Sequence, residues 1–115
     1  MGYAQNMPAE RDWKLFRKKL PKWQEAFMDR LNKEYVEILS QAGKNPSDIF
    51  WELDGRIKHD KRLTGVVIHD MSRSSMYGHL IELLQEDAIT LDDLSDFSED
   101  LQERFHWLMK PEERG

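Results

Sequence analysis

Apolar residues recur at helical spacing along most of the chain, and this pattern predicts a series of amphipathic helices. The most regular stretch is Lys22–Ala42, where apolar residues occupy one side of a helical projection and charged residues the other. A proline is tolerated mainly in a first helical turn, so Pro21 predicts a break between this helix and an earlier one that ends at Leu20. Gly43 is a suitable stop, and Asn45-Pro46 reads as an N-cap followed by the first residue of a third helix.

The second half of the chain predicts further helices with strong starting signals. We expect the third helix over about Pro46–Arg62 and a fourth over about Val66–Glu86, because the β-branched residues at its start have no evident strand partner. Thr90 and Asp93 have the spacing of a capping box. Ser98 can cap a last helix, with acidic residues in its first turn.

Together these elements predict an all-α fold, a compact bundle of about five helices with short connections. At 115 residues the chain is expected to form a single helical domain over 1–115, with frayed ends at 1–8 and 111–115. The apolar faces supply the predicted core, which consists of Phe16, Trp23, Phe27, Leu31, Ile38, Phe50, Leu53, Ile57, Leu80, Leu84, Leu94, Leu101 and Phe105.

Composition narrows the classes of function. The absence of cysteine excludes disulfides, thiolate metal sites and a cysteine nucleophile, and it fits a reducing cytoplasm. The longest apolar runs fall far short of the roughly 20 residues of a membrane span. Residues 1–11 lack the apolar segment of a secretory signal, so we expect a cytoplasmic protein without membrane contact.

Charge is distributed unevenly along the chain. Residues 1–73 carry 14 Lys and Arg against 11 Asp and Glu, whereas residues 74–115 carry 3 against 11. The stretch from Glu82 to Glu103 contains only acidic charges and predicts an acidic helical surface, either an ordinary solubilising face or one that docks on a basic protein. The basic and acidic halves can pair within one molecule or, head to tail, between two copies of the chain.

Motifs for catalysis and cofactor binding are weak. His59-Asp60 and His69-Asp70 each spell the His-Asp pair that metal phosphohydrolases use, but such short pairs also arise on ordinary polar surfaces. Nucleotide-binding glycine motifs, an HExxH pair, a serine elbow and an EF-hand loop are all missing. We therefore expect no catalytic residues, no metal site and no cofactor.

One aromatic and basic strip stands out on the third predicted helix. Trp51 lies on the side opposite the apolar face, in line with Lys58 and Arg62 at i+7 and i+11. A tryptophan among cations can stack on a nucleic-acid base or anchor a partner protein. The alternative is that the first helix covers Trp51 through Trp13 or Phe16. The predicted partner-binding residues are Trp51, Arg56, Lys58, Lys61 and Arg62.

Short sequence blocks between Trp51 and Ser98 resemble a group of small, uncharacterised bacterial proteins, some labelled multidrug transporters and many associated with mobile elements. The blocks are Trp51-Glu52-Leu53, Arg56-Ile57-Lys58, Asp60-Lys61, Gly65-Val66-Val67, Met71-Ser72-Arg73-Ser74, Leu83-Leu84, Ile89-Thr90, Asp93-Leu94 and Phe97-Ser98. The resemblance implies a bacterial, all-helical, intracellular protein. It offers no functional residues, and the transporter label conflicts with the lack of a membrane-length apolar run.

These observations favour a non-enzymatic interaction protein, regulatory or accessory in role, that presents a charged helical surface to another protein. A nucleic-acid-binding module that uses Trp51, Lys58, Arg62 and the basic first helix is the alternative, although a net charge of −5 opposes phosphate binding. A small metal-dependent hydrolase built around His59 or His69 comes third.

Overall fold

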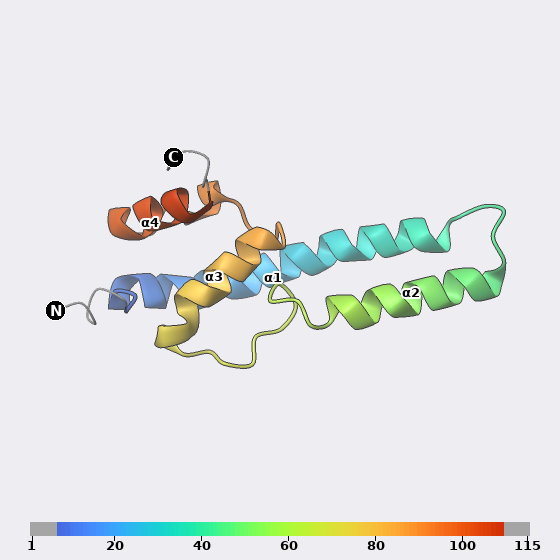
Figure 1. Ribbon diagram of the computed structural model, residues 1–115, viewed down its shortest axis with the longest axis horizontal. Helices are drawn as coiled ribbons and strands as arrows, with labels where there is room; N and C mark the ends of the chain where they lie inside the picture. Colours follow the sequence, from blue (N-terminus) through green and yellow to red (C-terminus); the bar gives the residue numbers. More distant parts are fainter. Residues whose placement is uncertain (1–6, 110–115) are drawn as a thin grey trace.

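The computed structural model describes residues 7–109, which form helices joined by turns and loops (Figure 1). The elements are α1 (Glu10–Leu39), α2 (Pro46–Asp60), α3 (Met76–Gln85) and α4 (Glu99–Met109), with short 3-10 turns at Arg73–Ser75 and Leu91–Leu94. The described residues contain no strand. The all-α class is confirmed, whereas the expected count of about five helices becomes four.

The count differs because α1 continues through Pro21. The break predicted at this proline is wrong, and the helices expected on either side of it form one helix of 30 residues. Pro21 is exposed, so the carbonyl group that loses its helical hydrogen bond can turn to water. Leu20 and Phe27 on either side of the proline are buried, and this packing holds both halves of α1 in one line.

The molecule has two regions that share α1 (Figure 1). The first half of α1 packs with α3, Leu91–Leu94 and α4, and we call this region the core module. The second half of α1, the loop 40–45 and α2 form a hairpin that extends away from the module, and we call it the arm. The molecule measures 60 × 33 × 21 Å, so it is elongated rather than compact as predicted.

The hydrophobic core lies in the module. Phe16 and Phe105 are fully buried, and edge-on or stacked rings link Phe16 to Trp23 and Trp23 to Phe97. The predicted core is confirmed for nine residues that are all buried: Phe16, Phe27, Leu31, Ile38, Leu80, Leu84, Leu94, Leu101 and Phe105. Trp23 and Leu53 are half-buried.

The prediction that Phe50 and Ile57 belong to the core is wrong. Phe50 is 61% exposed and Ile57 is 36% exposed, because no other element covers that side of α2 among the described residues. Asp60 is the one buried residue of α2. The arm is therefore a two-helix hairpin with apolar side chains that face outward.

The connector between α2 and α3 is irregular, although a helix was predicted from Val66. Gln24 of α1 donates a hydrogen bond to the carbonyl of Thr64, and the carboxylate of Glu86 accepts the backbone N–H groups of Thr64 and Gly65. Further along, Ser75 donates to Asp70 at 2.6 Å. Such side-chain bonds compete with helical ones, and α3 begins only at Met76.

The predicted helix starts in the acidic segment are present. Thr90 and Asp93 form the capping box, and the Ser98 hydroxyl accepts the N–H of Leu101. Ser98 is also hydrogen-bonded to α1. Its N–H and its hydroxyl both donate to the buried carboxylate of Asp12, at 2.9 and 2.6 Å.

The basic first half of the chain and its acidic second half contact each other within one molecule at this end of the module. Lys19 forms an ion pair with Asp96 at 3.0 Å, and Arg11 donates to the Asp96 carbonyl at 3.1 Å. The basic start of α1 and the acidic segment thus contact each other in the single chain. Pro8, in the segment expected to fray, is buried and its carbonyl accepts a hydrogen bond from Arg73. The predicted fraying of residues 1–6 and 111–115 concerns positions outside the described residues.

Candidate protein-interaction surface

The exposed strip predicted around Trp51 lies on the outer side of the arm. Asn45 stands at the N-cap of α2 and Pro46 at its first turn, so the helix begins where the sequence predicts and sets the direction of each side chain. Trp51 is 64% exposed and meets Phe50 edge-on, with ring centroids 4.9 Å apart. The alternative in which Trp13 or Phe16 covers Trp51 is wrong, since both rings stack on each other in the module.

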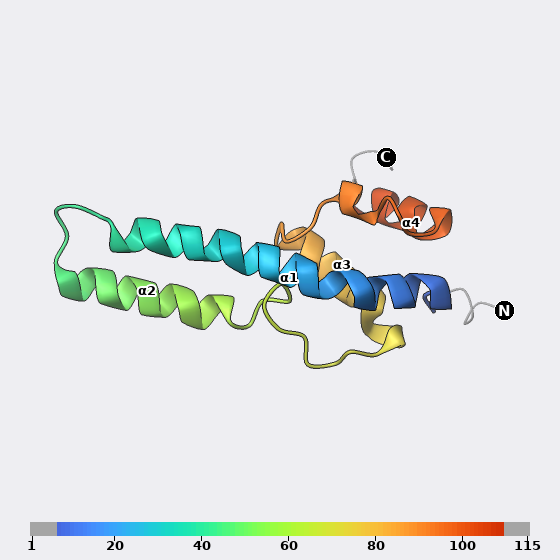
Figure 2. The same cartoon turned by 180° about the vertical axis from the view of Figure 1, so that it is seen from behind.

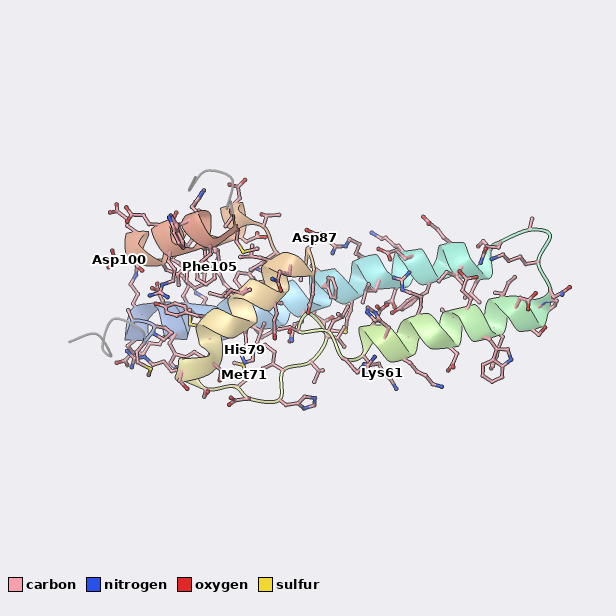
Figure 3. The ribbon with its side chains drawn as sticks, in the orientation of Figure 1. Lys61, Met71, His79, Asp87, Asp100 and Phe105 are labelled. Carbon is pink, nitrogen blue, oxygen red and sulfur yellow. The ribbon has the colours of Figure 1, made fainter. Side chains whose placement is uncertain are left out.

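Three cations follow Trp51 toward the base of the arm. Lys58 is exposed and forms an i, i+4 ion pair with Asp54 at 3.0 Å. Lys61 and Arg62 are also exposed, and their side chains have no ion pair within residues 7–109. Figure 3 shows Lys61 at the end of α2 nearest the module. Trp51, Lys58, Lys61 and Arg62 therefore form the part of the predicted site that the structure leaves open, and we call these four residues the outer strip.

Arg56 is placed differently from the rest of the predicted site. Its guanidinium group pairs with Glu34 of α1 and with Asp60, and it lies 5.6 Å from the centroid of the Tyr35 ring. At 100° per residue Arg56 stands about 140° from Trp51 around the helix, a separation already readable in the sequence. Arg56 thus joins α2 to α1 and does not belong to the outer strip.

Asp60 is the centre of this interhelical network. Its carboxylate accepts hydrogen bonds from the Tyr35 hydroxyl at 2.6 Å and from Arg56 at 3.2 Å, and His59 Nδ1 lies 2.9 Å away. Burial raises the pKa of Asp60, but the hydrogen bonds from Tyr35, His59 and Arg56 outweigh it and leave the pKa below its ordinary value. Burial and the bond to Asp60 raise the pKa of Tyr35 to about 12.

The predicted candidate metal ligands His59 and His69 lie in α2 and in the connector, and a further histidine, His79, lies in α3. His59 and His69 are exposed, and His79 contacts the Asp70 carbonyl through Nε2 at 2.7 Å. Figure 3 places His79 on α3, away from Lys61 at the end of α2. Within residues 7–109 no three His, Asp or Glu side chains gather in a way that could hold a metal ion.

A second charged surface runs along the start of α1. An open groove of about 830 Å³ follows this helix, and three of its six lining residues are basic and two are acidic. It is lined by Glu10, Arg11, Lys14, Leu15, Lys18 and Asp96. Lys14 pairs with Glu10 at 3.4 Å, and Arg17 lies over the ring of Trp13.

The sequence reasoning missed one set of surface residues, the apolar side chains near the tip of the arm. Val36 and Leu39 are 59% and 57% exposed, and Phe50 was assigned to the core instead. The available signal was the number of apolar positions in the arm, which exceeds what one interface between two helices can bury.

No family model matches the chain, and neither the curated proteins nor the solved structures searched contain a significant match. Within the described residues no helix is both long and apolar enough to cross a membrane.

Proposed function

We propose that this chain is a non-enzymatic interaction protein, with a regulatory or accessory role, that binds another protein through the outer strip of its arm. The observation that carries the proposal is the 64% exposure of Trp51 on a hairpin that projects from the module. An exposed tryptophan is a typical anchor residue of protein interfaces. Lys58, Lys61 and Arg62 would extend the contact toward carboxylates beside the pocket that receives the indole.

The division between module and arm supports this assignment. The module buries its own apolar cluster and holds the arm through α1, which runs without interruption through both regions. The network around Asp60 joins α2 to α1 near the base of the arm. A surface on such a supported hairpin can meet a partner without a change in the module.

The test replaces Trp51 by a photo-reactive tryptophan analogue and, in a matched variant, does the same at Trp107, which is 58% exposed on α4. Illumination in lysate of the source cells should give a crosslinked protein at position 51 and not at position 107. Lys58→Glu should weaken that crosslink, because it reverses a charge in the outer strip. Equal crosslinking from both positions, or a crosslink that survives Lys58→Glu and Arg62→Glu together, would contradict the proposal.

Nucleic-acid binding is the second candidate, and the groove along α1 with its three basic residues is the observation in its favour. Phosphate contacts release counterions, so binding by this route must weaken steeply as salt rises. Titration of a short DNA duplex into the protein at two salt concentrations, read by tryptophan fluorescence, distinguishes the candidates. A salt-sensitive response that Lys14→Glu and Lys18→Glu abolish would favour nucleic acid over a protein partner.

The resemblance to small bacterial proteins of mobile elements adds a setting to the proposal, a bacterial cytoplasm in which an accessory protein acts on another protein. A metal-dependent hydrolase stays a prediction that no contact among the described residues favours.

A further inference from the structure

Gly55 leaves a gap in the row of exposed side chains on the outer side of α2. It lies four residues after Trp51 and three before Lys58, so it stands about 40° and 60° from these residues around the helix. Gly55 is exposed, and apart from its chain neighbours no described side chain lies within 4 Å of a Cβ built on it. The backbone of α2 can therefore be approached from outside at this turn.

The side chains that border this gap contact partners elsewhere and do not close over it. Glu52 accepts a hydrogen bond from Gln41 at 2.9 Å. Lys58 pairs with the carboxylate one turn earlier at 3.0 Å, and His59 contacts the next residue through Nδ1 at 2.9 Å. The indole of Trp51 meets the preceding ring edge-on. The gap is thus bordered by side chains that are already engaged within the arm.

The fold of the described chain does not require glycine at this position. Gly43 has a φ of 79°, whereas Gly55 has no positive φ. At Gly65 a Cβ would overlap the ring of Phe27, but at Gly55 it would meet open space. Glycine lowers helix stability, and a use of glycine that fits this position is the close approach of another molecule to the backbone.

The charges along the outer side of α2 indicate what kind of molecule can lie there. The middle of the helix is neutralised by two ion pairs, Lys44 with Glu52 at 3.2 Å and Lys58 with Asp54 at 3.0 Å. At the base of the arm Lys61 and Arg62 have no ion pair among the described residues. Near the tip Asp48 is exposed and accepts a hydrogen bond from the Asn45 amide at 3.3 Å. A segment along this side is therefore attracted if its carboxylates lie at the base and its end at the tip is uncharged.

The outer side of α2 is open to a partner along its length. In both views α2 lies beside α1 and apart from α3 and α4 (Figure 1, Figure 2). Gly55 stands about 140° round α2 from Asp60, which is bonded to Tyr35 of α1. The gap thus faces away from the contact between the two helices of the arm.

We propose that the outer strip binds an acidic segment of another protein whose backbone crosses α2 at Gly55. An uncharged side chain of the segment meets the indole of Trp51, and its carboxylates reach Lys61 and Arg62. Trp51 and Arg62 lie roughly 16 Å apart along the helix axis, a distance that about five residues of an extended segment span. This inference rests on the proposed function and adds Gly55 as the residue that determines which segments fit.

The test uses the segment of the partner that the photo-reactive analogue at position 51 crosslinks. Mass spectrometry identifies this segment, and the corresponding synthetic peptide is titrated into the parent chain and its variants. Gly55→Ala should weaken peptide binding about tenfold, because the added methyl group holds the peptide backbone away from the helix. The same substitution should raise the unfolding temperature, which separates the loss of binding from a loss of folding.

Gly78→Ala is the matched control. Gly78 is an exposed glycine within α3, and like Gly55 it has open space around a built Cβ. Its substitution should raise the unfolding temperature and leave peptide binding unchanged.

Two results would overturn this inference while the proposed function stands. They are peptide binding that Gly55→Ala leaves unchanged and a crosslinked segment without net negative charge. A chain that gives no crosslink at position 51 would overturn the proposed function and this inference together.

Discussion

Helices α3 and α2 both pack against α1, but they are held there by different forces. The 10 residues of α3 bury four apolar side chains, Met76, Leu80, Leu83 and Leu84, in the module. The 15 residues of α2 bury one residue, the charged Asp60. Apolar burial from every helix dominates the stability of the module. In the arm the buried apolar residues, such as Leu31 and Ile38, come from α1, and α2 adds partly buried side chains and the hydrogen bonds around Asp60. A region held in this way keeps apolar side chains free for binding.

The largest expected contrast between the two regions comes from removing an aromatic ring. Phe105→Ala should lower the free energy of unfolding by about 3–5 kcal/mol, because Phe105 is fully buried and packs against Tyr77 with ring centroids 5.8 Å apart. Trp51→Ala on the arm should change it by less than about 0.5 kcal/mol. Urea denaturation of both variants measures the difference, and equal losses would mean that the arm buries Trp51 in solution.

The next contrast in stability comes from replacing two glycines by alanine. Gly65 lies in the connector between the two regions, and Gly55 lies in α2 of the arm. A Cβ at Gly65 would overlap the ring of Phe27, so Gly65→Ala should destabilise the protein by about 1–3 kcal/mol. Gly55 lies within α2 with no neighbouring atom within 4 Å of such a Cβ. Gly55→Ala should therefore stabilise the protein by about 0.5–1 kcal/mol through helix propensity. Thermal unfolding of the pair checks the signs, and a stable Gly65→Ala would show that Phe27 has room to move.

The difference between the regions also explains what the sequence could predict. Helical periodicity identified the apolar face of each helix, and in the module these faces meet, so Phe16, Leu80 and Phe105 are buried as predicted. The same periodicity in α2 placed Phe50 in the core. Periodicity shows which side of a helix is apolar, but it does not show whether another element lies against that side.

Predictions from local sequence signals failed where tertiary contacts favour another structure. Pro21 predicts a helix break, yet packing of Leu20 and Phe27 keeps α1 continuous. At the candidate site the spacing of Trp51, Lys58 and Arg62 correctly indicated exposed positions. Helical spacing already places Arg56 about 140° from Trp51, but it does not reveal the partner of Arg56, Glu34, which lies 22 residues earlier.

The hydrogen bonds around Asp60 make the stability of the arm depend on pH in the acidic range. The hydrogen bonds that lower the pKa of Asp60 stabilise the fold above its ordinary pKa of 3.8, and this contribution is lost as the pH falls below that value. Asp60→Asn should cost about 1–2 kcal/mol at neutral pH, and the difference from the parent should shrink in acid. Urea titrations from neutral pH to about pH 2 follow it; a gap that stays constant would contradict the network's role.

The smallest expected effect concerns the other end of the pH scale. The pKa of Tyr35 is raised from 10.0 to about 12, so its hydroxyl stabilises the fold fully below pH 10 and loses this contribution as the pH rises toward 12. Tyr35→Phe removes the bond to Asp60 and should cost about 1 kcal/mol at neutral pH. The parent and the variant should then converge between about pH 10 and 12. A double-mutant cycle with Asp60→Asn, measured at neutral pH and again in this alkaline range, isolates the shared bond. A coupling energy that persists unchanged at high pH would show that the two side chains stabilise the arm independently of the phenol proton.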